Sequence, residues 1–233
     1  MAVLGPPGPQ PGELQAGEPA RAHALDMVRQ AILGGDLAPG QRLIEEELAA
    51  ELSVTRASLR AALIELTTEG LVERVPNKGA RVRVVTADEA VAITECRMVL
   101  EALCAVKAAE RVTDEQIAAL RELGEGLKSS VADGDPLKYS AANTELHRVV
   151  GDISGQTVAV ELLARLNAQL VRHQFQLAQR PGRPEQSLGE HLAIIDAIIR
   201  RDPGAADEAT RRHLSSVITA LRAADFQQTP QPA

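Results

Sequence analysis

The chain has 233 residues and a net charge of −7, and 45% of its residues are apolar while only 1% are aromatic. No apolar run approaches the roughly 18 residues of a membrane-spanning helix, and so few aromatic rings argue against proteins that stack single-stranded bases. We therefore expect one or two globular domains with an aliphatic core and no membrane segment.

The first 86 residues predict a tail followed by three helices and a hairpin. Residues 1–20 contain five Pro and four Gly without a hydrophobic period, which is typical of a flexible tail. The pattern then predicts helices over residues 22–34, 45–52 and 56–69 and strands over 71–75 and 80–85. Thr55 is a suitable N-cap for the third helix. This order of elements indicates a winged helix-turn-helix domain, which we place at residues 21–86.

A local excess of basic residues in this domain indicates DNA as its partner. Residues 53–86 contain six basic and three acidic side chains, although the whole chain is acidic. The first turn of the third helix carries Arg56, Ser58 and Arg60, and such positions meet base edges in the major groove. Lys78 and Gly79 at the hairpin tip are placed to reach a phosphate or the minor groove. The alternative is that Arg56 and Arg60 are ordinary solvated charges.

After Thr86 the whole pattern is helical. It predicts helices near residues 87–111, 113–132, 136–153, 157–178, 184–201 and 204–225, and a second tail over residues 227–233. Thr113 and Gln116 form an N-terminal capping signal. The first of these helices is apolar almost all round, so we expect it to pack against a second copy of the chain. We therefore predict a mainly α protein in which residues 87–226 form an all-α, six-helix bundle.

The two cysteines, Cys96 and Cys104, lie in the first of these predicted helices. Eight residues of helix separate them by about 12 Å, which is too far for a disulfide bond. Unpaired thiols are typical of a reducing compartment, so we expect a cytoplasmic protein.

Three histidines occupy the apolar faces of three different predicted helices. His147, His191 and His213 each lie within a stripe of Leu, Ile and Val residues, and Asn143 lies one turn before His147 on the same side. Burying three imidazoles without partners is costly, and one divalent transition metal ion, Zn²⁺ or Ni²⁺, satisfies all three. The alternative is that each is a hydrogen-bonded core residue. His173 also lies on an apolar line, where it either lines the same pocket or packs in the core.

The N-terminal residues resemble the bacterial GntR-type regulators. The resemblance is carried by residues 35–49 (GDLAPGQRLIEEELA), 54–63 (VTRASLRAAL), 69–72 (EGLV) and 76–79 (PNKG). It implies that Arg56 and Arg60 contact operator DNA, together with the wing glycine Gly79 and neighbouring helix residues such as Thr55.

Three positions of this chain depart from the GntR pattern. Ser58 stands where the family often has Pro, and Ala61 stands where it often has Glu. Glu46 occupies a position where some members use an Arg to bind DNA, so we expect that contact to be missing or replaced.

The C-terminal helices resemble the FCD-type effector domain of FadR-like GntR regulators, with six helices as in the VanR-like subgroup. The resemblance is carried by residues 95–101 (ECRMVLE), 143–147 (NTELH), 190–198 (EHLAIIDAI) and 211–214 (RRHL). It implies that Asn143, His147, His191 and His213 hold one divalent ion, whose coordination a small carboxylate effector completes. Asp is usual at the position of Asn143, so we expect weaker metal binding or a greater reliance on an anionic effector.

Arg97 matches a family arginine that can face the effector pocket, which makes it, with His173, a candidate effector-binding residue. The alternative for Arg97 is an ion pair on the helix surface with Glu101, four residues further along.

These features favour a metabolite-responsive transcriptional regulator, expected to be a repressor, that binds a palindromic operator as a symmetric homodimer and responds to a small organic acid. One alternative is a regulator for which the metal ion itself is the signal. The other is a metal-dependent hydrolase or lyase with a DNA-binding appendage. Against an enzyme, the sequence has no HExxH motif, no nucleophile motif and no Gly-rich phosphate loop. The nearest acid, Glu190, points about 100° away from His191 on a helix.

Overall fold

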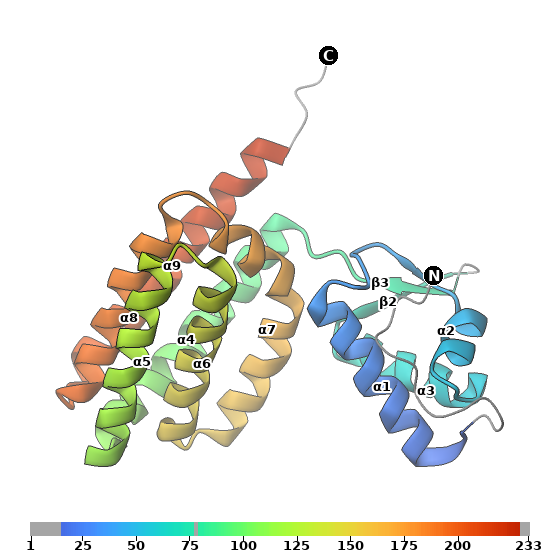
Figure 1. The fold of residues 1–233 in the computed structure, drawn as a ribbon, viewed down its shortest axis with the longest axis horizontal. Helices are drawn as coiled ribbons and strands as arrows, with labels where there is room; N and C mark the ends of the chain where they lie inside the picture. The colour runs from blue at the N-terminus through green and yellow to red at the C-terminus, as the bar shows by residue number, and fades with distance from the viewer. Residues whose placement is uncertain (1–14, 77–78, 229–233) are drawn as a thin grey trace. The chain divides into compact units, whose positions relative to one another are not determined.

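The computed structural model describes residues 15–76 and 79–228, and the chain divides into two units, Met1–Val85 and Thr86–Ala233 (Figure 1). The first unit combines helices with a small sheet, whereas the described part of the second unit is entirely helical. Every helix in the described ranges is too short or too polar to cross a lipid bilayer.

The first unit contains a helix-turn-helix and a small antiparallel sheet. Its helices are α1 (Gly17–Gly34), α2 (Glu45–Glu51) and α3 (Arg56–Thr68), and its strands are β1 (Arg42–Leu43), β2 (Val72–Val75) and β3 (Gly79–Val82). The strands pair in the order β1-β3-β2. Fully buried aliphatic side chains such as Val28, Leu59 and Leu66 form the core. The predicted winged helix-turn-helix fold is thereby confirmed.

Three features of the first unit differ from the prediction. The strand β3 ends at Val82, whereas the predicted strand extends to residue 85. The helix α1 begins at Gly17, inside the predicted tail, and its Ala20 is completely buried. The sheet also has a third strand, β1, in which Arg42 and Leu43 pair with Arg81 and Ala80 of β3. The start of α1 was missed because many Pro and Gly residues surround it. The strand β1 was missed because two residues are too few to show an alternating pattern. Residues 1–14 of the predicted tail lie outside the described residues.

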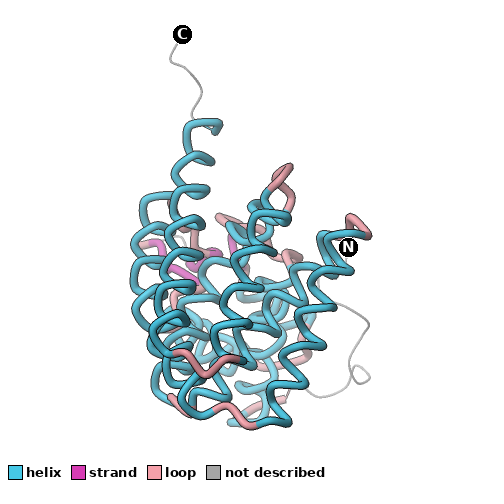
Figure 2. Tube along the Cα trace, turned by 90° about the vertical axis from the view of Figure 1, so that its left-hand side faces the viewer, coloured by secondary structure: helices cyan, strands magenta, loops and turns pink. Residues whose placement is uncertain are grey.

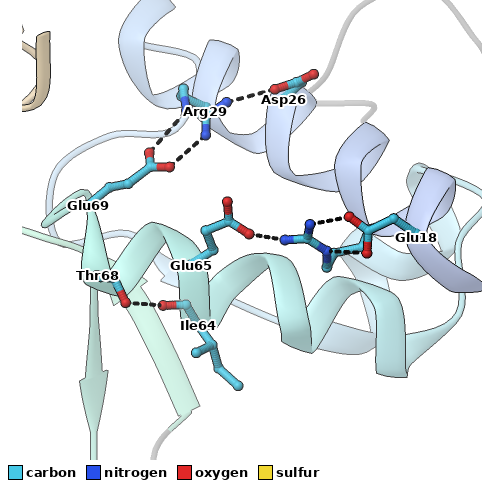
Figure 3. A network of polar contacts seen from close by, with 8 residues as sticks. Glu18, Asp26, Arg29, Ile64, Glu65, Thr68 and Glu69 are labelled. Atoms are coloured by element: carbon cyan, nitrogen blue, oxygen red, sulfur yellow. Dashed lines mark hydrogen bonds and ion pairs between the residues drawn. The ribbon is translucent and has the colours of Figure 1, made fainter. Parts of the chain in front are cut away.

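Ion pairs join α1 to the candidate recognition helix α3 (Figure 3). Arg29 donates to both carboxylate oxygens of Glu69, with Nε–Oε2 and Nη2–Oε1 distances of 3.0 and 2.6 Å. Arg21 also pairs with Glu65 across the two helices, through a single contact between Nη1 and Oε2. Glu65 of α3 and Glu69, the residue that follows this helix, are therefore neutralised by arginines of α1.

The second unit is a bundle of helices that lie side by side (Figure 2). They are α4 (Ala87–Arg111), α5 (Asp114–Ala132), α6 (Pro136–Ser154), α7 (Thr157–Ala178), α8 (Arg183–Ile199) and α9 (Pro203–Gln228). These bounds confirm the predicted helices to within three residues at each end, and Thr113 and Gln116 form the predicted capping box. α9 runs two residues into the predicted second tail, whose residues 229–233 lie outside the described ranges.

The long helix α4 packs against α6, α7, α8 and α9. Its buried side chains are mostly small, among them Ala102, Ala105, Ala108 and Ala109, so neighbouring helices can approach it closely. Leu120, Leu127 and Leu146 are fully buried and belong to the core that the bundle shares. α4 therefore forms one wall of the interior in which the histidines lie.

Candidate functional site

Three histidines from three helices meet in the interior of the second unit. His147 lies on α6, His191 on α8 and His213 on α9, and the ring nitrogens that they offer lie within 4.8 Å of one another. His191 and His213 are buried, whereas the side chain of His147 is 21% exposed. The three apolar helix faces thus bring the predicted histidines to one place.

Carboxylates hold the Nδ1 atoms of two of these histidines. His147 Nδ1 lies 3.0 Å from Oε2 of Glu101, and His213 Nδ1 lies 2.8 Å from Oε2 of Glu190. The contact of His213 with Glu190 is a hydrogen bond, whereas Oε2 of Glu101 has no hydrogen-bond partner among the described residues and is only a close neighbour of His147. An ionised carboxylate only accepts hydrogen bonds, so Nδ1 of His213 carries the proton and its Nε2 presents a lone pair. This carboxylate–histidine arrangement is the one that orients metal-binding imidazoles in proteins.

The separation between the two inner imidazoles suits a metal ion. The Nε2 atoms of His191 and His213 are 3.2 Å apart, and His191 Nδ1 lies 3.3 Å from the hydroxyl of Tyr139. Two nitrogens that each lie about 2.0–2.1 Å from a tetrahedral Zn²⁺ are separated by about 3.3 Å. A hydrogen bond between the two Nε2 atoms has a similar length, so the observed distance suits both a hydrogen bond and a shared metal ion.

The protonation states at the cluster also suit metal binding. Burial, reinforced by the neighbouring histidines, holds the pKa of His191 well below its usual range. Burial lowers the pKa of His213 as well, although its hydrogen bond with Glu190 opposes this shift. Burial by itself would raise the pKa of Glu101. The charge of Arg97 is the largest of the effects that outweigh burial, and together they hold this pKa well below its usual range. Neutral imidazoles beside ionised carboxylates are what a divalent ion requires.

Asn143 supplies an oxygen at the same place. It lies one turn before His147 on α6, and its Oδ1 atom is buried without a hydrogen-bond partner in the part of the chain that the structure describes. Leaving a buried carbonyl oxygen unpaired is costly, and a cation would relieve that cost. All four predicted ligands, including His191 and His213, line one small cavity of about 60 Å³. This donor set of three nitrogens and one oxygen fits Zn²⁺ or a similar ion.

Arg97 both pairs with Glu101 and lines the small cavity. Its Nε atom donates to Oε1 of Glu101 at 2.9 Å, so the pair with the residue four positions on is formed. Both side chains are buried, however, and the pair does not lie on the helix surface as that alternative supposed. Arg97 also lines the small cavity. It therefore places a buried positive charge beside the histidine cluster.

The proposed effector residue His173 is not among the residues that line the small cavity or its larger neighbour. The next residue on α7, Gln174, lines both cavities instead. One residue changes the direction of a helical side chain by about 100°. The lining of these two cavities therefore does not support the pocket role suggested for His173, which stays a prediction.

Sequence reasoning missed the residues that orient the histidines. Glu190 points away from His191 on its own helix, as expected, but it contacts His213 of α9 instead. Glu101 was considered only as a surface partner of Arg97. The sequence did contain a signal for the role of Glu101, because it is an acidic residue on the apolar face of α4.

The exposed beginning of α3 is the candidate DNA-binding surface of the first unit. Thr55 caps this helix, because its hydroxyl accepts from the backbone N–H of Ser58 at 3.2 Å. Arg56 is exposed on the first turn. Arg60 is also exposed, and its Nη2 atom lies 2.8 Å from Oε2 of Glu45 on α2. Ser58 is turned inward and bonded to Thr55 at 3.0 Å, so it holds the helix start together rather than presenting its hydroxyl to a partner.

The hairpin adds further basic residues to the first unit. Arg81 is exposed on β3 and pairs with Glu73 of β2 at 2.7 Å, while Arg74 is exposed on β2. The predicted alternation holds for Arg81, which is exposed, and Val82, which is buried, but not beyond the end of β3, because Val84 is exposed as well. Gly79 adopts a φ of +85°, a conformation that favours glycine. Lys78 lies outside the described residues.

Comparisons with known proteins agree with this division of the chain. Residues 20–82 match the family "Bacterial regulatory proteins, gntR family", and residues 92–216 match the FCD domain. The chain is 31% identical over 235 residues to the HTH-type transcriptional repressor NanR of Cronobacter sakazakii, covering 88% of this chain and 87% of that protein. NanR of Salmonella newport is 31% identical over 229 residues, with 85% of each chain covered.

Solved structures show the same fold. A transcriptional regulator GntR from Rhodococcus sp. RHA1 superimposes with a TM-score of 0.73 at 25% identity, covering 89% of this chain and 99% of that one. McbR/YncC of E. coli gives a TM-score of 0.70 at 22% identity, with 92% of this chain and 99% of that chain covered.

Proposed function

The chain belongs to the GntR family of bacterial regulatory proteins and carries an FCD domain, and we propose that it represses transcription until a small carboxylate metabolite binds at a metal site in that domain. Its relatives are named as transcriptional repressors, so the chain is a DNA-binding regulator rather than an enzyme. The observation that carries the proposal is the convergence of three histidine nitrogens within 4.8 Å of one another.

One divalent transition metal ion per subunit, Zn²⁺ or Ni²⁺, is the proposed cofactor. His147, His191 and His213 would hold it through ring nitrogens, and Asn143 would add its buried Oδ1. When bound, such an ion supplies a Lewis-acidic anchor for carboxylate oxygens. Because Asn143 brings no negative charge, an anionic effector would contribute more to holding the ion than it would beside an aspartate.

Arg97 is the proposed second anchor for the effector carboxylate. It lines the same small cavity as the four ligands and is bonded to Glu101 on its own helix. That helix, α4, begins directly after the boundary between the two units. An effector changes operator affinity only if it favours one arrangement of the protein over another. A ligand that moves α4 is therefore in a position to act through the segment that joins the units.

On the DNA side, the proposed contacts are Thr55, Arg56, Arg60, Lys78 and Gly79. Glu65 of α3 and Glu69 directly after it are neutralised by α1, so the exposed first turn keeps its positive charge. Operator binding requires Arg60 to exchange its partner Glu45 for DNA, because the two side chains are paired in the free protein.

Separate titrations of operator binding with zinc and with organic acids test the proposed function. We expect zinc alone to leave the operator complex intact, and one member of a panel of carboxylates to release it only from metal-loaded protein. Release by zinc alone would show that the ion itself is the signal. If no carboxylate binds metal-loaded protein, the effector part of the proposal is wrong.

We also propose that the regulator is a homodimer that uses α4 and α7. Val99 and Leu103 lie one turn apart on α4, and both are exposed although they are large and apolar. Val158 and Leu162 repeat this arrangement on α7, which packs against α4. Exposed apolar side chains gathered on adjoining elements are typical of protein–protein contacts.

Leu103→Glu is expected to convert the dimer to a monomer, because it places a charge in the proposed apolar interface. Operator affinity should fall with it, since two recognition helices about 34 Å apart are needed to read two half-sites. Light scattering at micromolar concentration measures the change. Leu137→Glu is the matched control, because Leu137 is equally apolar and even more exposed but lies on α6. A monomeric wild-type protein would refute the proposed dimer.

A further inference from the structure

A second, larger cavity adjoins the small cavity of the histidine cluster. Its volume is about 300 Å³, against about 60 Å³ for the small one. Arg97, Asn143, His147 and Gln174 line both cavities, so the two meet at the edge of the cluster. An ion and the few oxygen atoms bound to it suffice to fill the small cavity. The larger one, between α4, α6 and α7, is left for the remainder of a ligand.

We propose that the larger cavity binds the body of the effector, and that the effector is a monocarboxylate with an extended, mainly apolar body. This inference rests on the proposed function, since the carboxylate end is anchored at the metal site. A cavity of about 300 Å³ has room for about ten groups of the size of a water molecule. An acid as small as acetate would leave nearly all of that space unused.

One side of the larger cavity, formed by α7 and the adjoining part of α6, is mainly apolar. α7 contributes Val160, Leu163 and Ala164, which recur at helical spacing on one face, and α6 contributes Val150. Asn167, one turn further along α7, has a buried Oδ1 atom without a hydrogen-bond partner in the described parts of the chain. The wall therefore favours a mainly apolar body, and the Asn167 oxygen can accept a hydrogen bond from one donor group on it.

The positive charges of the arginines on this wall already have partners within the protein, and Oε2 of Glu101 adds a buried negative charge without a hydrogen-bond partner in the described residues. Arg97 and Glu101 pair with each other, with Nη2 and Oε1 2.7 Å apart. Arg148 is exposed at the rim and pairs with Glu145 and Asp152 on its own helix. A second carboxylate at the far end of an effector would lose its hydration without gaining a matched cation. The cavity therefore favours a monocarboxylate over a dicarboxylate of the same length.

A series of straight-chain acids tests the inference on the full-length, zinc-loaded protein. Calorimetry with butanoate, hexanoate and octanoate should show an affinity that rises about fourfold for each added methylene, as expected when each methylene enters an apolar site. Octanedioate, which differs from octanoate by a second carboxylate, should bind at least about tenfold more weakly.

A substitution at the rim of the larger cavity tests the location. Ala164 is exposed, so the fold tolerates a larger side chain there. Ala164→Phe should narrow the cavity and weaken octanoate binding at least about tenfold, while butanoate binding stays unchanged. Ala164→Ser changes the same position with almost no change in size, and both acids should bind it as they bind the wild type.

The outcomes separate this inference from the proposed function on which it rests. A flat chain-length series, or octanedioate binding as tightly as octanoate, overturns the apolar body but leaves a metal-anchored carboxylate effector in place. Equal loss of butanoate and octanoate in Ala164→Phe overturns the assigned location. If none of the acids binds while zinc does, both the inference and the carboxylate part of the proposed function are wrong.

Discussion

Replacing Arg56 with alanine is expected to abolish specific operator binding while leaving the fold intact. Arg56 is exposed on the first turn of α3, where a guanidinium can pair with the edge of a guanine. Each lost contact of this kind weakens binding by about 10- to 100-fold, and a dimer loses one in each half-site. Alanine is a better helix former than arginine, so α3 itself should persist. Fluorescence anisotropy with a duplex selected by the wild-type protein measures the affinity.

The matched control for Arg56→Ala is Arg200→Ala. Arg200 is also an exposed arginine, but it lies at the end of α8 in the second unit and pairs with Asp196. Its loss should leave operator affinity within about twofold of the wild type. The DNA-binding role of α3 is wrong if Arg56→Ala retains wild-type affinity for the selected duplex.

Replacing His191 with alanine is expected to remove the metal ion. The imidazole of His191 is buried at the centre of the cluster, within ring-contact distance of both His147 and His213. Removing one of three nitrogen ligands leaves two nitrogens and the Asn143 oxygen, so the affinity for Zn²⁺ should fall by at least about 100-fold. Elemental analysis of protein purified without chelator should then show about one ion per wild-type subunit and close to none in the variant.

Two further variants control the His191→Ala experiment. His173→Ala removes a histidine of α7 that is not among the residues lining either cavity, so its metal content should match the wild type. Asn143→Asp adds a negative charge at the position of the oxygen ligand and should raise metal affinity. Equally little metal in wild type and His191→Ala would instead identify the cluster as a hydrogen-bonded part of the core.

The helices after Thr86 could be predicted from the sequence because local signals determine where each of them begins and ends. The capping box of Thr113 and Gln116 involves residues three apart, and Asp135 caps α6 in a similarly local way. The helical spacing of apolar residues is equally local. The strand β1 was missed because its two residues form a strand only through their pairing with Arg81 and Ala80, about forty positions away.

The histidine cluster could be predicted for the same reason, whereas its surroundings could not. Each histidine lies on an apolar stripe, and apolar stripes of neighbouring helices face one interior. Glu190 was misjudged because only its direction relative to His191 on α8 is local, while its contact with His213 depends on how α9 packs against α8. The same holds for the pairing of Arg60 with Glu45, which depends on the packing of α2 against α3.

The sequence by itself thus determined the two domains' fold types, the limits of the helices after Thr86 to within three residues, and the four residues that converge on one cavity. Only the tertiary structure decided which carboxylates hold the histidines, that the pair of Arg97 and Glu101 is buried, and that a cavity of about 300 Å³ adjoins the site. Periodicity and capping depend on residues a few positions apart. Side-chain partners and cavities depend on the rotation and spacing of packed helices, which residues distant in the sequence jointly set.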